Sequence, residues 1–418
     1  MREWKLPFSE KIVGRTLTAA LGAALLVTPL EVLAAPDSAA AAAASTKTAA
    51  AAKSESAPLN KGDMGVGQSR VLNDKQIKQL WNGIDPRFLP DNAIASVKAV
   101  LPEKEYEALF PYRLGSPEWH KAAEGKEYND PNQGDYYAYQ NLIGAVTAVA
   151  NIKYKVSYRE GSPGVQEIYR LDKKTKKETL VARTDDFNKS ANLKKKVITE
   201  IVDFGSFLQE GSDRDRKRDL AALLANLSHE TGGGAADSPG GELRWGLFWN
   251  QNIAGRTGAN MSAFVDPASA KLYPGVAGKR YYGRGPIMMS WNFNYGLISS
   301  IIYGDKNVLL KNPESVAEDG KLGFMTALIF WLTPQAPKPS AHDVMVGKWK
   351  PDKEQTAKGL VPPGFGVSVM VLNGLEANLG EVDGSPIKRR AGHYRDITAR
   401  MGLNVIGEKM DTLGMKPF

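Results

Sequence analysis

The stretch 220–234, LAALLANLSHETGGG, places a glutamate at the end of a helical pattern. Four leucines have the i, i+3, i+4, i+7 spacing of one buried helix face: Leu220, Leu223, Leu224 and Leu227. At roughly 100° per residue, Glu230 lies about 80° from the centre of this face, at its edge. We therefore expect a partly desolvated carboxyl group with a raised pKa, as a general acid near neutral pH requires.

The elements around this glutamate are also indicated by the sequence. Ser212, with Asp215 three residues later, is typical of a helix N-cap and predicts where the helix begins. Gly232, Gly233 and Gly234 follow the glutamate without side chains, so we expect room for a bulky ligand. On these residues alone, an ordinary helix end followed by glycines remains the alternative interpretation.

Composition excludes several kinds of site. The chain has 418 residues, 42% of them hydrophobic, which is enough for a large core. Cysteine is absent and the four histidines are scattered, so we expect no disulfide, no metal site and no cofactor. The net charge is +8, and residues 151–200 contribute +6 of it (13 Lys and Arg against 7 Asp and Glu). No nucleic-acid motif accompanies this charge, so we expect no nucleic-acid partner.

Three regions are predicted. Residues 1–35 have the basic start, apolar run and small residues of a secretory signal peptide. Pro29 and Glu31 interrupt the apolar run, which argues against a stable membrane span. Residues 36–70 are rich in Ala and Ser and are predicted to be a disordered linker. Residues 71–418 are predicted to form the folded domain, exported to the cell envelope, secreted or periplasmic.

Helical patterns dominate the domain. Tyr136–Ile152 and Leu322–Leu332 are predicted to be buried helices, and Asn188–Glu200 a lysine-rich helix. Residues 153–183 alternate in polarity between turn residues, which predicts a small β-hairpin or meander. We interpret the lysines of this region as solvated surface.

Five stretches, in order along the chain, resemble glycoside hydrolase family 19, the chitinases of plants and some bacteria. They are KRDLAALLANLSHETGGG, YYGRGPIMMSWNFNYG, IFWLTPQAPKPSAHDVMVGKW, GFGVSVMVLNGLEANLG and KRRAGHYRDI. The resemblance runs from about Leu101 to Leu403, with 151–200 as an unmatched insertion. It implies a mostly α, α+β lysozyme-like fold of two helical lobes, with a central cleft and the small β insertion.

The resemblance implies inverting hydrolysis of β-1,4-linked N-acetylglucosamine polymers, in which one carboxyl group protonates the leaving oxygen and a second activates water. Glu230 matches the general acid. Ser290 and Asn294 match residues that hold the water and the sugar, and Arg390 with Glu376 matches an ionic network that tunes the carboxylates. The remaining expected substrate-binding residues are His229, Trp245, Tyr282, Met288 and Asn373.

Two residues depart from the family pattern. The position expected for the general base is Asn252, or Asn250 with a different gap, and neither is acidic. An amide orients water by hydrogen bonds but cannot take its proton. Met288 stands where the family has glutamine. Glu242 or Asp237, in the preceding loop, would supply a carboxylate if that loop folds inward.

Nearby aromatic residues are candidate sugar-stacking walls, with the core as the alternative location: Trp245, Trp249, Trp291, Tyr281 and Tyr282.

Three functions follow as hypotheses. The first is an exported monomeric chitinase that acts on chitin or a related polysaccharide. The second is a peptidoglycan hydrolase with the same cleft, because the basic insertion suits acidic peptides. The third is a chitin-binding or glycan-binding protein that has lost its general base.

Overall fold

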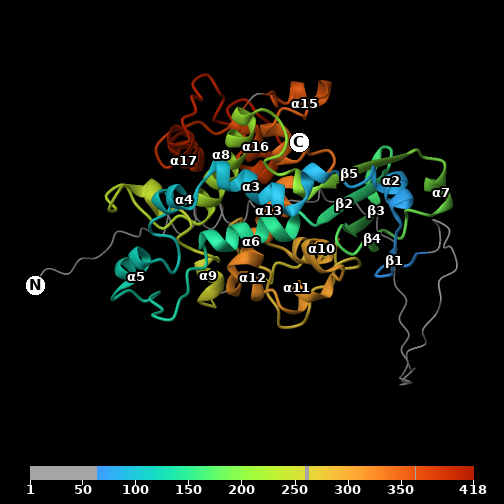
Figure 1. Cartoon of the computed structure of the whole chain (residues 1–418), viewed down its shortest axis with the longest axis horizontal. Coiled ribbons are helices and arrows are strands. Elements are labelled where there is room, and N and C mark those ends of the chain that lie inside the picture. Colours follow the sequence, from blue (N-terminus) through green and yellow to red (C-terminus); the bar gives the residue numbers. More distant parts are fainter. Residues whose placement is uncertain (1–63, 259–262, 363) are drawn as a thin grey trace, which may run out of the picture.

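The computed structural model describes residues 64–258, 263–362 and 364–418. Helices fill most of the molecule, and a small antiparallel sheet lies at one end, on the right of Figure 1. The predicted fold class, mostly helical with a small β insertion, is confirmed. Residues 1–35 and most of the predicted linker lie outside the described residues. Within the described ranges, no helix has the length and hydropathy that crossing a membrane requires.

Short loops connect the helices of the described chain. The α-helices are α2 (Asp74–Trp81), α3 (Pro90–Val100), α4 (Glu103–Leu109), α5 (Pro117–Ala123), α6 (Tyr139–Val149), α7 (Ser190–Leu193), α8 (Asp213–Glu230), α9 (Ile253–Arg256), α10 (Asn292–Tyr303), α11 (Asn307–Lys311), α12 (Ser315–Glu318), α13 (Gly320–Leu332), α14 (Ala341–Met345), α15 (Lys353–Ala357), α16 (Phe365–Leu372) and α17 (Pro386–Arg400). The described residues also form four 3-10 helices: η2 (Pro86–Phe88), η3 (Phe204–Ser206), η4 (Glu242–Trp245) and η5 (Gly374–Glu376).

Five strands of the described chain form one antiparallel sheet in the order β1-β4-β3-β2-β5. The strands are β1 (Ser69–Val71), β2 (Ile152–Arg159), β3 (Ser162–Asp172), β4 (Lys177–Arg183) and β5 (Val197–Asp203). Four of them fall in the predicted insertion or at its end. The insertion is therefore larger than a hairpin, and it recruits β1 from the start of the described chain.

Two sequence predictions need correction. The expected helix over 188–200 is only α7, and β5 follows it, because VITEIVD is rich in the β-branched residues that favour strands. The predicted linker also extends too far, since Met64 is 3% exposed and β1 pairs with β4. The folded region therefore includes residues 64–70.

Several lysines of the sheet are buried rather than solvated. The Lys155 ammonium lies 3.2 Å from Glu178 Oε1, and the Trp81 indole donates to the same oxygen at 2.8 Å. Lys173 Nζ donates to Asp203 Oδ1 at 2.7 Å. In contrast, the lysine run 194–196 is exposed, as expected. Buried polar contacts thus join the sheet to the preceding segment, which includes α2 and η2.

Helix α8 lies in the core, and α17, α14 and α16 pack against it. The expected leucine face is confirmed, because Leu220, Leu223, Leu224 and Leu227 are all at most 1% exposed. The buried helix expected over 322–332 is α13, and Figure 1 shows it near the centre of the molecule.

A buried histidine anchors the first half of α8. His342 Nδ1 lies 2.7 Å from Asp219 Oδ2 on α8, and its Nε2 lies 3.1 Å from Glu210 Oε2, just before the helix. The Trp331 indole donates to the other Asp219 oxygen at 2.7 Å. Burial lowers the pKa of His342, but Asp219 and Glu210 outweigh it and raise the pKa to about 10.

Replacing His342 with leucine is expected to cost about 3–5 kcal/mol of unfolding free energy, because Asp219 is left as an uncompensated buried charge. Protonated His342 contributes its full stabilisation at pH values below 6.5, the ordinary pKa of histidine. This stabilisation is lost as the pH rises through about 10, the pKa in the folded protein. Urea unfolding at several pH values measures both effects, and His342→Leu should lack this alkaline loss. The half-exposed Lys348, changed to alanine, is the control and should cost less than about 1 kcal/mol.

Candidate functional site

Helix α8 delivers Glu230 at its last residue. The predicted N-cap is confirmed, since Ser212 and Asp215 form a reciprocal capping box at the start of the helix. Eighteen residues later the helix ends, and Thr231 caps it through its backbone N–H to Leu227. Local capping thus fixes where along the chain the carboxyl group leaves the helix.

The Glu230 side chain is 9% exposed and accepts a hydrogen bond from Arg390 Nη2 at 2.6 Å. Burial raises the pKa of Glu230, Arg390 lowers it, and the neighbouring Glu376 charge raises it again. The balance lies above the ordinary value, as the sequence analysis expected. Glu230 is therefore suited to hold a proton at a pH where an exposed glutamate is ionised.

Arg390 of α17 gathers residues from three segments. Its Nε and Nη2 donate to Glu376 of η5 at 2.9 and 2.7 Å, and its Nη1 donates to Asn226 of α8 at 3.0 Å. Asn373 Nδ2 donates to Glu376 Oε1 at 2.9 Å. The structure therefore brings Arg390 and Glu376 together with Glu230, as the family resemblance implies, and Asn373 bonds to the same group through Glu376. Asn226 is not among the residues expected from the sequence, where its only signal is a lone amide within an apolar stretch of helix.

The glycine turn after Glu230 is filled by the protein's own aromatic side chains. A Cβ atom at Gly233 would lie 2.3 Å from the Phe248 ring, and one at Gly234 would lie 2.6 Å from Trp245 Cβ. The expected room for a ligand at these two positions is therefore wrong. Thr231 O also accepts the backbone N–H groups of Phe248 and Trp249, so this segment holds the turn.

Asn252 lies at the start of α9 and caps it. Its Oδ1 accepts from Gly255 N at 3.1 Å, and its own N–H donates to Gly283 O at 2.8 Å. Asn250 is 8% exposed and donates from Nδ2 to Ala317 O at 2.7 Å. Both amides therefore have structural partners, and neither supplies a carboxylate.

The two loop carboxylates proposed as substitutes lie near the surface. Asp237 is exposed. The Glu242 side chain is 40% exposed and lies 4.0 Å from Arg389, the neighbour of Arg390 on α17. Of the two, Glu242 is the one that approaches the helix of the charge network.

Backbone bridges join the second signature segment, 281–296, to the segment of Asn252. Arg284 pairs with Gln251 and with Met289, which links the segment of Asn252 to that of Ser290. Ser290 Oγ donates to Met288 O at 3.0 Å, and Asn294 Nδ2 donates to Ser290 O at 2.8 Å.

All three signature side chains are nearly buried: Met288, Ser290 and Asn294. Asn294 Oδ1 is buried without a hydrogen-bond partner in the described part of the chain, so this acceptor is unsatisfied.

Most of the candidate stacking aromatics serve the core. Trp245 is 9% exposed and stacks on Tyr112 with ring centroids 4.2 Å apart. Tyr282 is 8% exposed, and the Arg284 guanidinium lies 3.7 Å from its ring centre. Tyr281 is fully buried, whereas Trp249 and Trp291 keep partial exposure.

His229 precedes Glu230 and is held neutral. Burial, together with the charges of Arg390 and Arg389, lowers its pKa well below the ordinary value. Its Nδ1 is buried and makes no hydrogen bond to any described residue. The ring therefore has one unsatisfied polar atom in a buried place.

A separate cluster has the ligand types of a metal site. One ligand atom each of Glu210, His342 and Asp343 lies within 4.8 Å of the others. Lys348 Nζ lies 2.9 Å from Glu210 and 3.5 Å from Asp343, so an ammonium already neutralises these carboxylates. We treat the cluster as the ion-pair network that anchors α8.

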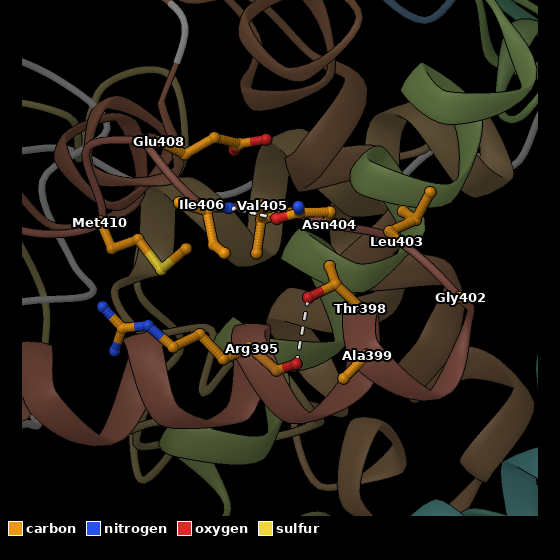
Figure 2. Close-up of a pocket in the computed structure, with 11 residues that line it drawn as sticks. Arg395, Thr398, Ala399, Gly402, Leu403, Asn404, Val405, Ile406, Glu408 and Met410 are labelled. Atoms are coloured by element: carbon orange, nitrogen blue, oxygen red, sulfur yellow. Dashed lines mark hydrogen bonds between the residues drawn. The ribbon is translucent and has the colours of Figure 1, made fainter.

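A cavity of about 560 Å³ lies between the second half of α17 and the loop that follows it (Figure 2). Figure 2 shows Met410, Val405 and Ile406 on one side of it and Thr398 with Ala399 on the other. Its lining includes none of the residues bonded to Glu230. The cavity is thus distinct from the candidate acid site, although both use α17.

Comparison with known proteins places these residues in a family. The model of class I chitinases, glycoside hydrolase family 19, matches residues 172–412, more than half of the chain. Chitinase 9 of Oryza sativa subsp. japonica is 41% identical over 223 residues, which cover 53% of this chain and 63% of that protein. An endochitinase of Carica papaya is 42% identical over 216 residues, which cover 51% and 83%. The chain spans less than two thirds of the first rice relatives.

Solved structures give weaker similarity. Chitinase C from Streptomyces griseus HUT6037 is 22% identical with a TM-score of 0.43, covering 75% of this chain and 80% of that one. The family 19 class IV chitinase from Zea mays is 26% identical with a TM-score of 0.34, covering 48% and 77%.

The filled turn makes a testable prediction. Gly234→Ala should cost about 1–3 kcal/mol of unfolding free energy, because the new methyl group overlaps Trp245. Gly134→Ala is the matched control, since a Cβ there meets no heavy atom within 4 Å, and it should stay within about 0.5 kcal/mol of wild type. Equal urea midpoints for the two variants would contradict the assignment of this contact.

Proposed function

Because this chain belongs to the class I chitinase family, glycoside hydrolase family 19, we propose that it hydrolyses β-1,4-linked N-acetylglucosamine polymers with Glu230 as the general acid. The observation that carries the proposal is the buried Glu230 carboxyl group, held by Arg390 and with its pKa raised. A glycosidase needs such a group to protonate the oxygen of the departing sugar. Chitin is the substrate that the names of the relatives support.

In this mechanism the Glu230 proton passes to the glycosidic oxygen as the bond to the anomeric carbon breaks. Water attacks that carbon from the opposite face, which inverts its configuration, and the proton that the attacking water loses passes to solvent. Ser290 and Asn294 are proposed to orient the water and the sugar. Asn294 Oδ1 has no hydrogen-bond partner among the described residues, which supports this role. Asn373, fixed by Glu376, is proposed to bind the substrate.

The water-activating step is the weak part of this site. Asn252 offers an amide, and its oxygen already caps α9. The amide group holds water without removing its proton. A positioned general base contributes typically 10²–10⁴-fold to rate, so we expect slow turnover.

We further propose that the protein is exported. The signal-like residues 1–35 and the Ala-rich segment after them support a secreted or periplasmic location. In that compartment peptidoglycan is a second possible substrate, and the exposed lysines 194–196 support contact with its acidic peptides.

The second candidate function is glycan binding without catalysis. The observation that favours it is again Asn252, an N-cap where the family resemblance expects a general base. A binding protein keeps the sugar-holding residues and needs no base. The two functions differ in one measurement, because only the hydrolase releases reducing ends.

Glu230→Gln should lower the release of reducing ends from chitin oligomers by about 10²–10⁴-fold, because an amide has no proton to give to the leaving oxygen. Glu160→Gln is the matched control, since it neutralises an exposed carboxylate between β2 and β3 that has no proposed role in catalysis, and it should leave the rate unchanged. Cell-wall suspensions assayed in parallel compare peptidoglycan as substrate. If the wild type releases reducing ends as slowly as Glu230→Gln but still binds the oligomers, the protein is a glycan-binding protein and the proposed hydrolase activity is refuted.

Asn252→Glu should raise turnover by about 10²-fold, because it places a carboxylate where the reaction lacks one. The change removes a good N-cap from α9 and should cost about 1 kcal/mol of stability. Asn252→Ala separates the two effects, since it loses the cap without adding a base. A rate for Asn252→Glu no higher than that of Asn252→Ala would refute the idea that position 252 limits catalysis.

A further inference from the structure

Asn226 is a fully buried amide on α8, one turn before Glu230. Its Nδ2 donates to Ala222 O at 2.8 Å, and its Oδ1 accepts from Arg390 Nη1 at 3.0 Å. Because the two ends of the amide have different partners, its orientation is fixed. A buried polar group in a run of Leu and Ala is costly unless it is bonded in this way.

The bond to Asn226 completes the contacts of the Arg390 guanidinium. Nε and Nη2 face Glu376 at 2.9 and 2.7 Å, and Nη2 also faces Glu230 at 2.6 Å. The third nitrogen, Nη1, faces Asn226. Since the guanidinium is planar, contacts on all three nitrogens fix both its position and its plane.

The neutral charge of Asn226 matters as much as its geometry. The site buries one cation, Arg390, with two carboxyl groups, Glu230 and Glu376. An amide oxygen gives Arg390 a further acceptor without a third negative charge. A carboxylate at position 226 would instead compete with Glu230 for the same guanidinium.

We propose that Asn226 is a positioning residue, which holds the Arg390 guanidinium against Glu230 and so sets how readily the acid gives up its proton. The proposal rests on the proposed function, because Glu230 acts as the acid there. It adds a residue that does not touch the substrate, and it acts through Arg390 alone.

The test follows the Glu230 carboxyl group by ¹³C NMR titration of the full chain, with its signal assigned by its loss in Glu230→Gln. Asn226→Asp should raise the pKa of Glu230, since the new carboxylate draws Arg390 away and repels the Glu230 charge. Asn226→Ser should raise it less, since serine can keep the bond to Ala222 but does not reach Arg390. A hydrogen bond to a charged group changes an equilibrium constant by about tenfold, so shifts of that order are expected.

Ser228→Ala is the matched control. Ser228 is also fully buried on α8 and also donates to the carbonyl four residues earlier, Leu224 O at 2.7 Å, but it has no bond to Arg390. This variant should leave the Glu230 titration as in wild type even if it lowers the unfolding midpoint. The basic limb of the kcat/KM profile should move with the NMR pKa in the Asn226 variants, while KM stays constant.

A Glu230 titration unchanged in Asn226→Asp and Asn226→Ser overturns the proposal, as does an equal shift in Ser228→Ala. If Asn226→Asp does not fold, Asn226→Ser decides. A wild type that hydrolyses nothing defeats the proposed function, and the substrate-free NMR titration still decides the role of Asn226.

Discussion

One buried guanidinium organises the candidate site. Arg390 is 1% exposed and is shared between Glu230 and Glu376, so a single cation serves two carboxyl groups that are almost completely removed from water. Removing one partner from a buried ion pair typically costs 3–5 kcal/mol, which means that each residue requires the other two. This requirement joins α8, η5 and α17, whose residues lie far apart in the chain. The site therefore depends on the packing of α8 against α17 as much as on Glu230.

The charge balance of this network suits the role of acid that we propose for Glu230, whereas position 252, expected for the base, is an asparagine. With one positive and two negative charges in a buried place, a proton on Glu230 relieves the excess negative charge. That arrangement favours proton donation. Asn252 belongs to a different local structure, where it caps α9 and bonds to Gly283. The contacts of Asn252 and those of Arg390 have no residue in common, so an asparagine at position 252 is compatible with the Glu230 network.

The sequence predicted those features that are set by local chemistry. The cap at Ser212, the leucine face and the end of the helix at Glu230 follow from neighbouring residues, and all are present. The network of Arg390 and Glu376 around Glu230 was expected from family resemblance, since nothing local pairs Arg390 with a residue 160 positions earlier. Burial was harder to predict. Lys155 is buried because Glu178 faces it across the sheet, and Phe248 fills the space at Gly233 from a distant loop.

The chain segment between α6 and α8, which contains β2 to β5, has its two ends side by side. Lys153, near the start of β2, pairs with Asp203, the last residue of β5, so the chain leaves the helical body and returns to it side by side. An excursion with adjoining ends can be gained or lost in evolution without shifting the helices on either side. β1 and α2 are also joined to this sheet, because Arg70 of β1 and Trp81 of α2 both donate to Glu178 on β4. Residues 152–203 therefore hold the preceding segment in place, and deleting them would leave the Trp81 indole without its acceptor, Glu178.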